Sequence, residues 1–293
     1  MSEKRGWRNH YRASMPASER VIKDLRSFAG DIGRGIRNAG KLRTIVTYPD
    51  YPSKRTTIYK IARKLGYRLT NKPLKNADIV MLFEDTTLKS TSTDAYLQNA
   101  KHVLNLKCTD ISKVNVEAVH QKIFGYGTFI DPLTFVGKAV EKSDENAKHD
   151  GHYITCPINA VVPNCIYQII LENQDDDGLA VDHRVPVMNG IIPLVWLKIK
   201  KWDVRFTNDI YRSELYTPHD LFSEEELTLI RKFSAEIHAD FCELDIIRHK
   251  TDGKIYIIDV NTTPFGPPAG LPDAPRIESV QKLSGAFEAG FIA

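Results

Sequence analysis

Two carboxylates and one amide near the C-terminal end of the sequence have the spacing of a metal site. Two runs rich in β-branched residues, 243–250 and 254–261, flank a short polar segment that ends in Asp252-Gly253. A three-residue loop, 251–253, with its glycine in the left-handed conformation is a common closure of a β-hairpin. This loop places Asp245 directly across from Asp259, and because side chains alternate along a strand, Asn261 lies on the same side as Asp259.

Oxygen ligands of this kind suit Mg²⁺, which keeps its other positions for water and for substrate phosphates. The alternative is a surface hairpin whose acids simply face water. Both aspartates, however, stand among leucine, isoleucine and valine residues, where an unpaired carboxylate is costly to bury. The pattern therefore favours a metal site formed by Asp245, Asp259 and Asn261.

The elements before this hairpin indicate two kinds of architecture. Segment 44–48 has the composition of a strand, 56–65 has the apolar spacing of a helix that ends at Gly66, and 78–83 and 103–106 resemble buried strands. Strand, helix and strand in this order predict a small α/β lobe with parallel strands.

The pattern changes from about residue 116. We expect a helix over 116–124 and strands over 166–171, 180–187 and 192–198, joined by hairpin-like turns at Asp177-Gly178 and Asn189-Gly190. Ser223 followed by Glu226 forms a capping box and predicts a further helix. These features indicate an α+β region with largely antiparallel strands.

Composition and charge limit the classes of protein. The chain has 293 residues, 42% of them hydrophobic and 26% charged, with a net charge of +3. The longest apolar run, 190–197, is too short to span a bilayer, and the first forty residues lack the apolar core of a signal peptide. The four cysteines show no metal-binding spacing and are expected to be buried thiols. We expect a cytoplasmic protein.

The N-terminal segment is strongly basic. Residues 1–43 contain eleven lysines and arginines against four acids, a net charge of +7, and apolar residues recur at helical spacing between Val21 and Ile36. Such a segment could rest on an anionic membrane surface or bind a polyanion. We favour a solvated helix that packs on the main body. No zinc spacing or aromatic RNA-binding motif accompanies it, so we expect no nucleic-acid partner.

The metal hairpin resembles the ATP-grasp superfamily, in which an aspartate on one strand is followed by Glu-or-Asp-x-Asn-x-x-Pro on the next. Here the matching positions are Asp245 and 259–264, and the resemblance covers roughly residues 116–268. It implies an ATP-grasp fold, in which a small N-terminal α/β lobe precedes two α+β subdomains that clamp ATP. The implied division is a basic, partly helical segment 1–41, an N-terminal α/β domain 42–112 and an ATP-grasp domain 113–293.

The resemblance also implies nucleotide-binding residues. Lys122 and Lys142 look like the two nucleotide lysines, although Lys138 competes with Lys142 and a solvated loop lysine is the alternative. Gln168 lies on the segment whose backbone would read the adenine edge, or it is only a half-buried strand glutamine. Asp182 would take the ribose hydroxyls and Arg184 a phosphate, unless the two merely pair with each other.

The residues implied for chemistry are Arg205 and Asn208. Both would face the transferred phosphoryl group, where an arginine stabilises developing charge; a surface salt bridge is the alternative for Arg205. The implied cofactors are ATP and one or two Mg²⁺, with Mn²⁺ as an alternative ion. The reaction expected first is a ligation of a small-molecule carboxylate to an amine through an acyl-phosphate, by an enzyme that could form a homodimer.

Two departures from the family pattern bear on the reaction. Many carboxylate–amine ligases of the superfamily have an arginine two residues before the first metal aspartate, and this chain has Glu243 there. Either Arg205 takes over its task or the chemistry differs. The form Ile-Asp-Val-Asn at 258–261 looks like the inositol phosphate kinases of the superfamily, which makes a small-molecule kinase the alternative. A non-catalytic nucleotide-binding protein is a third hypothesis.

Overall fold

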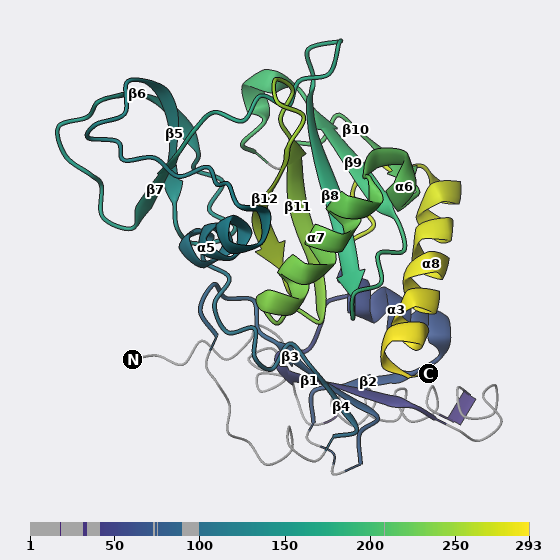
Figure 1. Cartoon of the computed structure of the whole chain (residues 1–293). Coiled ribbons are helices and arrows are strands. Elements are labelled where there is room, and N and C mark those ends of the chain that lie inside the picture. Colours follow the sequence, from purple (N-terminus) through teal and green to yellow (C-terminus); the bar gives the residue numbers. More distant parts are fainter. Residues whose placement is uncertain are drawn as a thin grey trace.

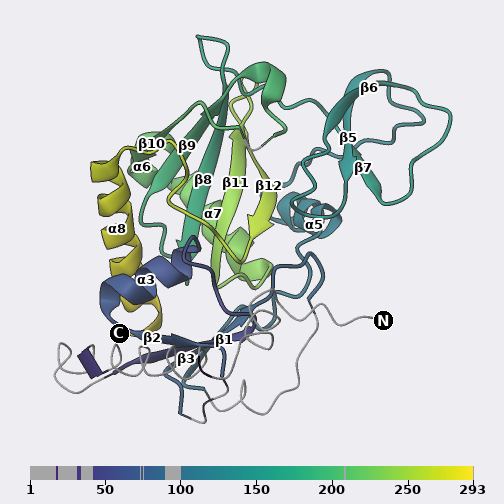
Figure 2. The ribbon, with the colours of Figure 1, turned by 180° about the vertical axis from the view of Figure 1, so that it is seen from behind.

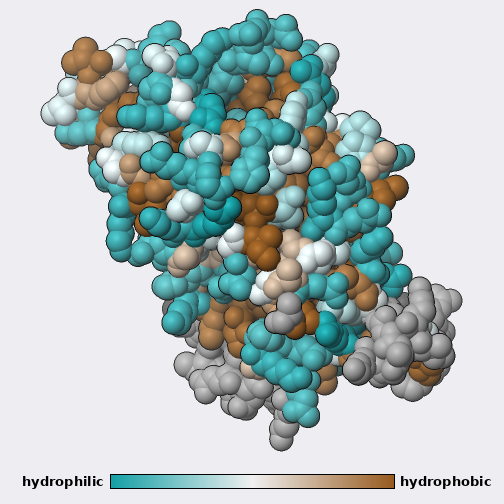
Figure 3. Space-filling view, turned by 45° about the vertical axis from the view of Figure 1, so that its right-hand side comes forward, coloured by the Kyte–Doolittle hydropathy of each residue, from teal (hydrophilic) through white to brown (hydrophobic). Residues whose placement is uncertain are grey.

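The computed structural model of the chain describes residues 18, 32–33, 42–72, 74, 76–89, 100–207 and 209–292. The basic segment 1–41 and its expected helix lie almost wholly outside these residues. Three β-sheets and their covering helices make up the described part (Figure 1). No helix in these ranges combines the length and the apolar character needed to cross a membrane. On the face shown in Figure 3, hydrophilic side chains predominate and hydrophobic atoms show in separate patches.

A four-stranded parallel sheet forms the first lobe, with the strand order β2-β1-β3-β4. Its strands are β1 (Thr44–Pro49), β2 (Arg68–Thr70), β3 (Ile79–Phe83) and β4 (His102–Leu104). Helix α3 (Thr57–Leu65) connects β1 to β2 and ends at Gly66, whose φ of 70° lies in the left-handed region. The predicted parallel α/β lobe is confirmed.

A small three-stranded antiparallel sheet follows, in the order β6-β5-β7. Helix α5 (Lys113–Phe124) leads into β5 (Gly137–Ser143), β6 (His152–Cys156) and β7 (Cys165–Gln168). Buried Glu117 of α5 accepts hydrogen bonds from Thr128 and from the backbone N–H of Phe129, so the helix fixes the loop that enters this sheet. Strand β7 ends three residues earlier than the predicted 166–171.

The largest sheet has five antiparallel strands in the order β10-β9-β8-β11-β12. They are β8 (Ala180–Met188), β9 (Val195–Lys200), β10 (Arg212–Tyr216), β11 (Phe241–Arg248) and β12 (Ile255–Asn261). The short helices η1 (Trp202–Val204) and α6 (Pro218–Leu221) flank β10 in the chain. The predicted strands over 180–187 and 192–198 are confirmed, the second with a start at Val195.

Helix α7 (Glu224–Glu236) covers one face of this sheet (Figure 1). Its Leu227, Ile230 and Phe233 pack in one cluster with Val185 of β8 and Leu244 of β11, all of them buried. The predicted capping box is present, because the Ser223 side chain accepts from the N–H of Glu226 while the Glu226 side chain accepts from the N–H of Ser223.

The opposite face of the sheet is divided between apolar and charged residues. At one end Met188, Trp196 and Phe241 pack against helix α8 (Asp273–Phe291) and α3, in a cluster that continues into β1 and β3. The Trp196 indole donates to the hydroxyl of Ser279 on α8 at 2.9 Å. Figure 2 shows α3 and α8 together beside the four-stranded sheet. The remainder of this face carries charged side chains and lines a cleft.

The capping box offers a test of how α7 is held. We expect Ser223→Ala to lower the free energy of unfolding by about 1 kcal/mol, since it leaves a backbone N–H of the first turn without its acceptor. Ser223→Asp, whose carboxylate also caps well, is the matched control and should unfold close to the parent. Urea unfolding followed by circular dichroism measures both. Equal losses in the two variants would contradict a role for the cap.

Candidate active site

The charged end of the five-stranded sheet faces the small β6-β5-β7 sheet across a cleft of about 1810 Å³. Segments 84–88 and 144–151 and the loop 265–269 complete its walls. Its volume exceeds the roughly 300–1,000 Å³ of an ordinary small-molecule pocket, so the cleft has room for more than one ligand. The cationic side chains that line the cleft include Lys113, Lys142, Arg184, Lys198, Lys200 and Arg205.

The hairpin of β11 and β12 pairs Asp245 with Asp259, as predicted, although its turn differs from the prediction. His249 pairs with Lys254, so the turn has four residues, 250–253, rather than three. A four-residue turn alone would shift the pairing of β11 with β12 by one residue from the predicted register. A β-bulge between Asp245 and Ile246 leaves Ile258 unpaired and restores the register. Directly opposed residues share a face of the sheet, so both carboxylates face the cleft.

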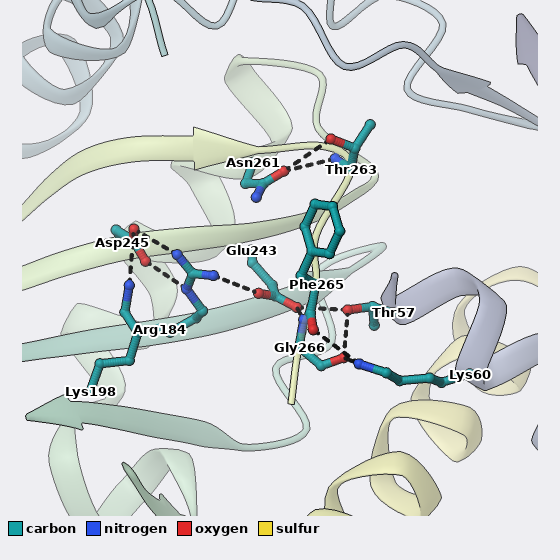
Figure 4. Close-up of polar contacts among 10 residues, drawn as sticks. All are labelled: Thr57, Lys60, Arg184, Lys198, Glu243, Asp245, Asn261, Thr263, Phe265 and Gly266. Carbon is teal, nitrogen blue, oxygen red and sulfur yellow. Dashed lines mark hydrogen bonds and ion pairs between the residues drawn. The ribbon is translucent and has the colours of Figure 1, made fainter. Parts of the chain in front are cut away.

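Asp245 is held by two cations, one from the neighbouring strand β8 and one from β9 beyond it. Arg184 of β8 donates from Nε to Oδ1 and from a terminal nitrogen to Oδ2, both at 2.9 Å, and the Lys198 ammonium lies 3.6 Å from Oδ2 (Figure 4). Burial alone would raise the pKa of Asp245, but Arg184 and Lys198 outweigh it and lower that pKa. Asp245 is therefore an ionised carboxylate in contact with two cationic side chains.

Asp259 has a different electrostatic environment. Burial, and next the negative charge of Asp245, raise the pKa of Asp259 to about 6, against the opposing effect of Lys113 and Lys142. Its Oδ1 accepts from the backbone N–H of Val260 at 3.0 Å. The side-chain oxygen of Asn261 accepts from the N–H of Thr263 at 2.9 Å, which fixes its orientation at the end of β12.

The structure separates the lysines proposed for the nucleotide. Lys142 of β5 lines the cleft and has no hydrogen-bond or ion-pair partner among the described residues, whereas its competitor Lys138 is exposed and outside the cleft. Burial, and next the nearby Lys113, lower the pKa of Lys142 to about 8. Lys122 points away from the cleft and pairs with Glu236 of α7 at 2.6 Å. Lys122 therefore lies outside the cleft, whereas Lys113, at the start of the same helix, lines it.

Two further lysines of the site were missed in the sequence. Lys198 and Lys200 alternate along β9, each only 7% exposed, and both line the cleft. Lys200 pairs with Asp182 at 3.1 Å, while Arg184 pairs with Asp245. The alternative that Asp182 and Arg184 pair with each other is therefore wrong. The sequence could have indicated these two site residues, because lysines at alternate positions of an otherwise apolar strand lie on one face of the sheet.

Gln168 and Arg205 also line the cleft. The Gln168 amide is buried and donates to the Thr128 hydroxyl at 2.9 Å, so this part of its side chain already has a partner. Arg205 lies 4.1 Å from the centre of the Trp202 ring and donates to the carbonyl of Leu171 at 3.2 Å. Asn208 lies outside the described residues.

Glu243 has a structural role that its position in the sequence did not reveal. It is 2% exposed and accepts from the Thr57 hydroxyl at 2.9 Å and from the N–H of Gly266 at 3.1 Å (Figure 4). Its second oxygen lies 3.5 Å from Arg184. A Cβ at Gly266 would overlap the Glu243 carboxylate and the Trp196 ring, so only glycine fits here. Glu243 thus ties α3 and the loop 264–268 to the strand that carries Asp245.

The chain is similar to known proteins in its structure. No protein-family model and no curated protein sequence matches the chain. Among solved structures, the ATP-grasp ligase PsnB, in complex with a phosphomimetic variant of its minimal precursor, Mg and ADP, has a TM-score of 0.56 at 11% identity, covering 84% of this chain and 99% of that one.

Two amino-acid ligases show similar agreement. The D-alanine–D-alanine ligase of Bacillus anthracis with ATP has a TM-score of 0.52 at 11% identity, covering 86% of this chain and 97% of that one. The VanG D-Ala:D-Ser ligase of Enterococcus faecalis has a TM-score of 0.52 at 9% identity, covering 86% and 100%. Over most of its length, the chain has the ATP-grasp fold.

Proposed function

We propose that the chain is a magnesium- and ATP-dependent ligase that joins a carboxylate to an amine through an acyl-phosphate. The observation that carries the proposal is the meeting of Asp245, Asp259 and Asn261 in a cleft ringed by unpaired or partly paired cations. The ATP-grasp ligases named above, which share the fold, support the choice of reaction class.

The donor set of this hairpin fits a magnesium ion. Two carboxylates and an amide oxygen are hard ligands, and carboxylates have lone pairs left after the hydrogen bonds that Asp245 and Asp259 already make. Burial, and next the negative charge of Asp245, raise the pKa of Asp259, and a divalent cation bound there would favour its ionised form. Bound there, one or two Mg²⁺, or Mn²⁺ in their place, would neutralise phosphate charge.

The surrounding cations divide into roles by position. We assign Lys113, Lys142, Lys198 and Lys200 to the phosphates of the nucleotide, since they flank the metal carboxylates on several sides. Backbone groups of segment 168–171 would read the adenine, with Gln168 and Arg205 beside it. Asp182 remains the residue proposed for the ribose hydroxyls.

Arg184 is better placed than Arg205 for charge that develops during phosphoryl transfer. Its guanidinium lies between Asp245 and Glu243, at 2.9 and 3.5 Å. An arginine from the neighbouring strand thus occupies the region where Glu243 replaces the arginine of related ligases. We therefore assign to Arg184, in place of Arg205, the stabilisation of charge on the transferred phosphoryl group. With this arginine beside it, a glutamate at position 243 is compatible with a ligase.

The reaction needs positioning more than proton transfer. A carboxylate oxygen of the substrate forms a bond to the γ-phosphorus as the bond to the bridging oxygen of ATP breaks, and ADP leaves. The amine nitrogen then attacks the acyl carbon, phosphate departs with the C–O electron pair, and the amine loses a proton. Lysine and arginine side chains held in a partly buried cleft orient the phosphates and stabilise the charge.

A small-molecule kinase is the second candidate, favoured by Asp259 at the position where ligases commonly have glutamate. The ligase and the kinase differ in the fate of the γ-phosphate. It is followed with labelled ATP, Mg²⁺ and metabolite fractions rich in amines or in sugars. We expect free phosphate to appear with ADP only when an amine is present. Label retained on an organic acceptor without free phosphate would establish the kinase.

The same assay tests the metal hairpin. Asp259→Asn removes one of the two negative charges while keeping the shape, and we expect turnover to fall by about a hundredfold or more. An unchanged circular dichroism spectrum shows that the fold is intact. Full activity in this variant would mean that the metal lies elsewhere.

Lys142 and Lys138 form a matched pair on one strand. We expect Lys142→Gln to weaken the binding of Mg and a non-hydrolysable ATP analogue by about tenfold, since a charge-assisted contact to phosphate is worth roughly 1.5–3 kcal/mol. Lys138→Gln, outside the cleft, should bind as the parent does. Isothermal titration calorimetry measures both, and equal affinities in the two variants would refute the assignment of Lys142.

A further inference from the structure

The end of the cleft beyond the metal hairpin carries a second group of cations. Lys54 and Arg55 directly precede α3, Lys60 lies on its first turns, and Arg276 comes from α8. Phe265, Pro267 and Pro268 of the adjoining loop provide an apolar wall. These residues come from parts of the sequence more than two hundred positions apart, and no local motif unites them.

Most of these cations have no acidic partner. Within the described ranges, neither the Lys54 nor the Arg55 side chain makes a hydrogen bond or ion pair. The Lys60 ammonium donates to the carbonyls of Phe265 and Gly266 at 3.0 and 2.8 Å, which leaves its third N–H available (Figure 4). Arg276 donates to the carbonyl of Leu271 at 2.7 Å and lies 3.3 Å from the exposed Asp273.

Lys60 is partly buried and lies near one carboxylate, Glu243, and two guanidinium groups, Arg276 and Arg55. Burial lowers the pKa of Lys60 to about 8, and nearby Arg276 and Arg55 act in the same direction, whereas Glu243 opposes them. Glu84 and Asp85 also line the cleft, and both act on buried Lys89. The positive end of the α3 macrodipole adds to the same potential.

This end is separate from the cations assigned to the nucleotide phosphates. Figure 4 shows Lys198, Asp245 and Arg184 at one side and Lys60 at the other, with Glu243 and Gly266 between them. The contacts of Arg184 with Glu243, and of Glu243 with Thr57 and Gly266, connect the two ends through side chains. A substrate lying over this connection would have one group at the metal hairpin and another at Arg55 and Arg276.

We propose that the carboxylate substrate bears at least one further anionic group, a carboxylate or a phosphate-type group, which binds between Arg55, Lys60 and Arg276. The proposal rests on the ligase function, because that function places a carboxylate beside the metal hairpin. Arginine suits both kinds of anion through its planar fork of N–H donors. The partly desolvated Lys60 adds a point charge, and the loop wall restricts the substrate's carbon skeleton.

Saturation-transfer NMR and calorimetry on the full chain test this with defined probes. Butyrate has one carboxylate, glutarate has two, and 4-phosphonobutyrate replaces the second carboxylate of glutarate with a phosphonate. We expect one or both dianions to bind at least about tenfold more tightly than butyrate, and the tighter one identifies the second anion. Butyrate binding as tightly as both dianions would overturn the proposal.

Variants locate the anion. Arg55→Gln and Arg276→Gln should each weaken dianion binding by about five- to tenfold without changing butyrate binding. Arg63→Gln is the matched control, because Arg63 is an exposed residue of the same helix outside the cleft. Unchanged dianion affinity in both cleft variants would contradict the placement.

Binding of Mg and a non-hydrolysable ATP analogue, measured on the same samples, separates this inference from the proposed function. Retained nucleotide binding without any preference for dianions would reject the anionic substrate alone. Absence of nucleotide binding by the parent chain would instead reject the proposed ligase function.

Discussion

The Arg184 guanidinium between the half-buried Asp245 carboxylate and the buried Glu243 carboxylate is the interaction on which the site depends. Arg184 makes two hydrogen bonds with Asp245 and lies 3.5 Å from Glu243, and all three groups face one side of the same sheet. Charges taken out of water are tolerated only when they are paired, and removal of one partner leaves an uncompensated buried charge, at a cost of about 3–5 kcal/mol. The register of β8 against β11 is therefore electrostatically as well as hydrophobically specified.

The same network connects the two ends of the cleft. Glu243 accepts from α3 and from the loop 264–268, so the strand carrying Asp245 is joined to the first lobe by polar contacts as well as by the shared core under α8. In the proposed ligase, Arg184 of β8 supplies the positive charge beside Glu243. Groups proposed to bind the nucleotide and the second substrate are thus held by one continuous set of contacts.

Local patterns predicted much of this arrangement. The pairing of Asp245 with Asp259 was predicted correctly, because a hairpin and the alternation of side chains along a strand are local properties. The predicted turn was one residue too short, and a bulge at Ile258, which was not predicted, compensated for it. Lys122 was predicted and Lys113 was not considered, although the two lie nine residues apart on one helix and so on opposite sides of its axis. Only tertiary contacts decide which face of α5 meets the cleft. The cluster of Arg55, Lys60 and Arg276 depends wholly on the fold.

The metal hairpin is the central claim, and crystallography with Mn²⁺ and a non-hydrolysable ATP analogue tests it most directly. Anomalous scattering locates Mn²⁺ independently of any assumption about its ligands. We predict a peak bound by oxygens of Asp245, Asp259 and Asn261, with the phosphates of the analogue directed toward Lys142. A metal and nucleotide bound elsewhere in the cleft, with Asp245 still paired only to Arg184 and Lys198, would contradict it.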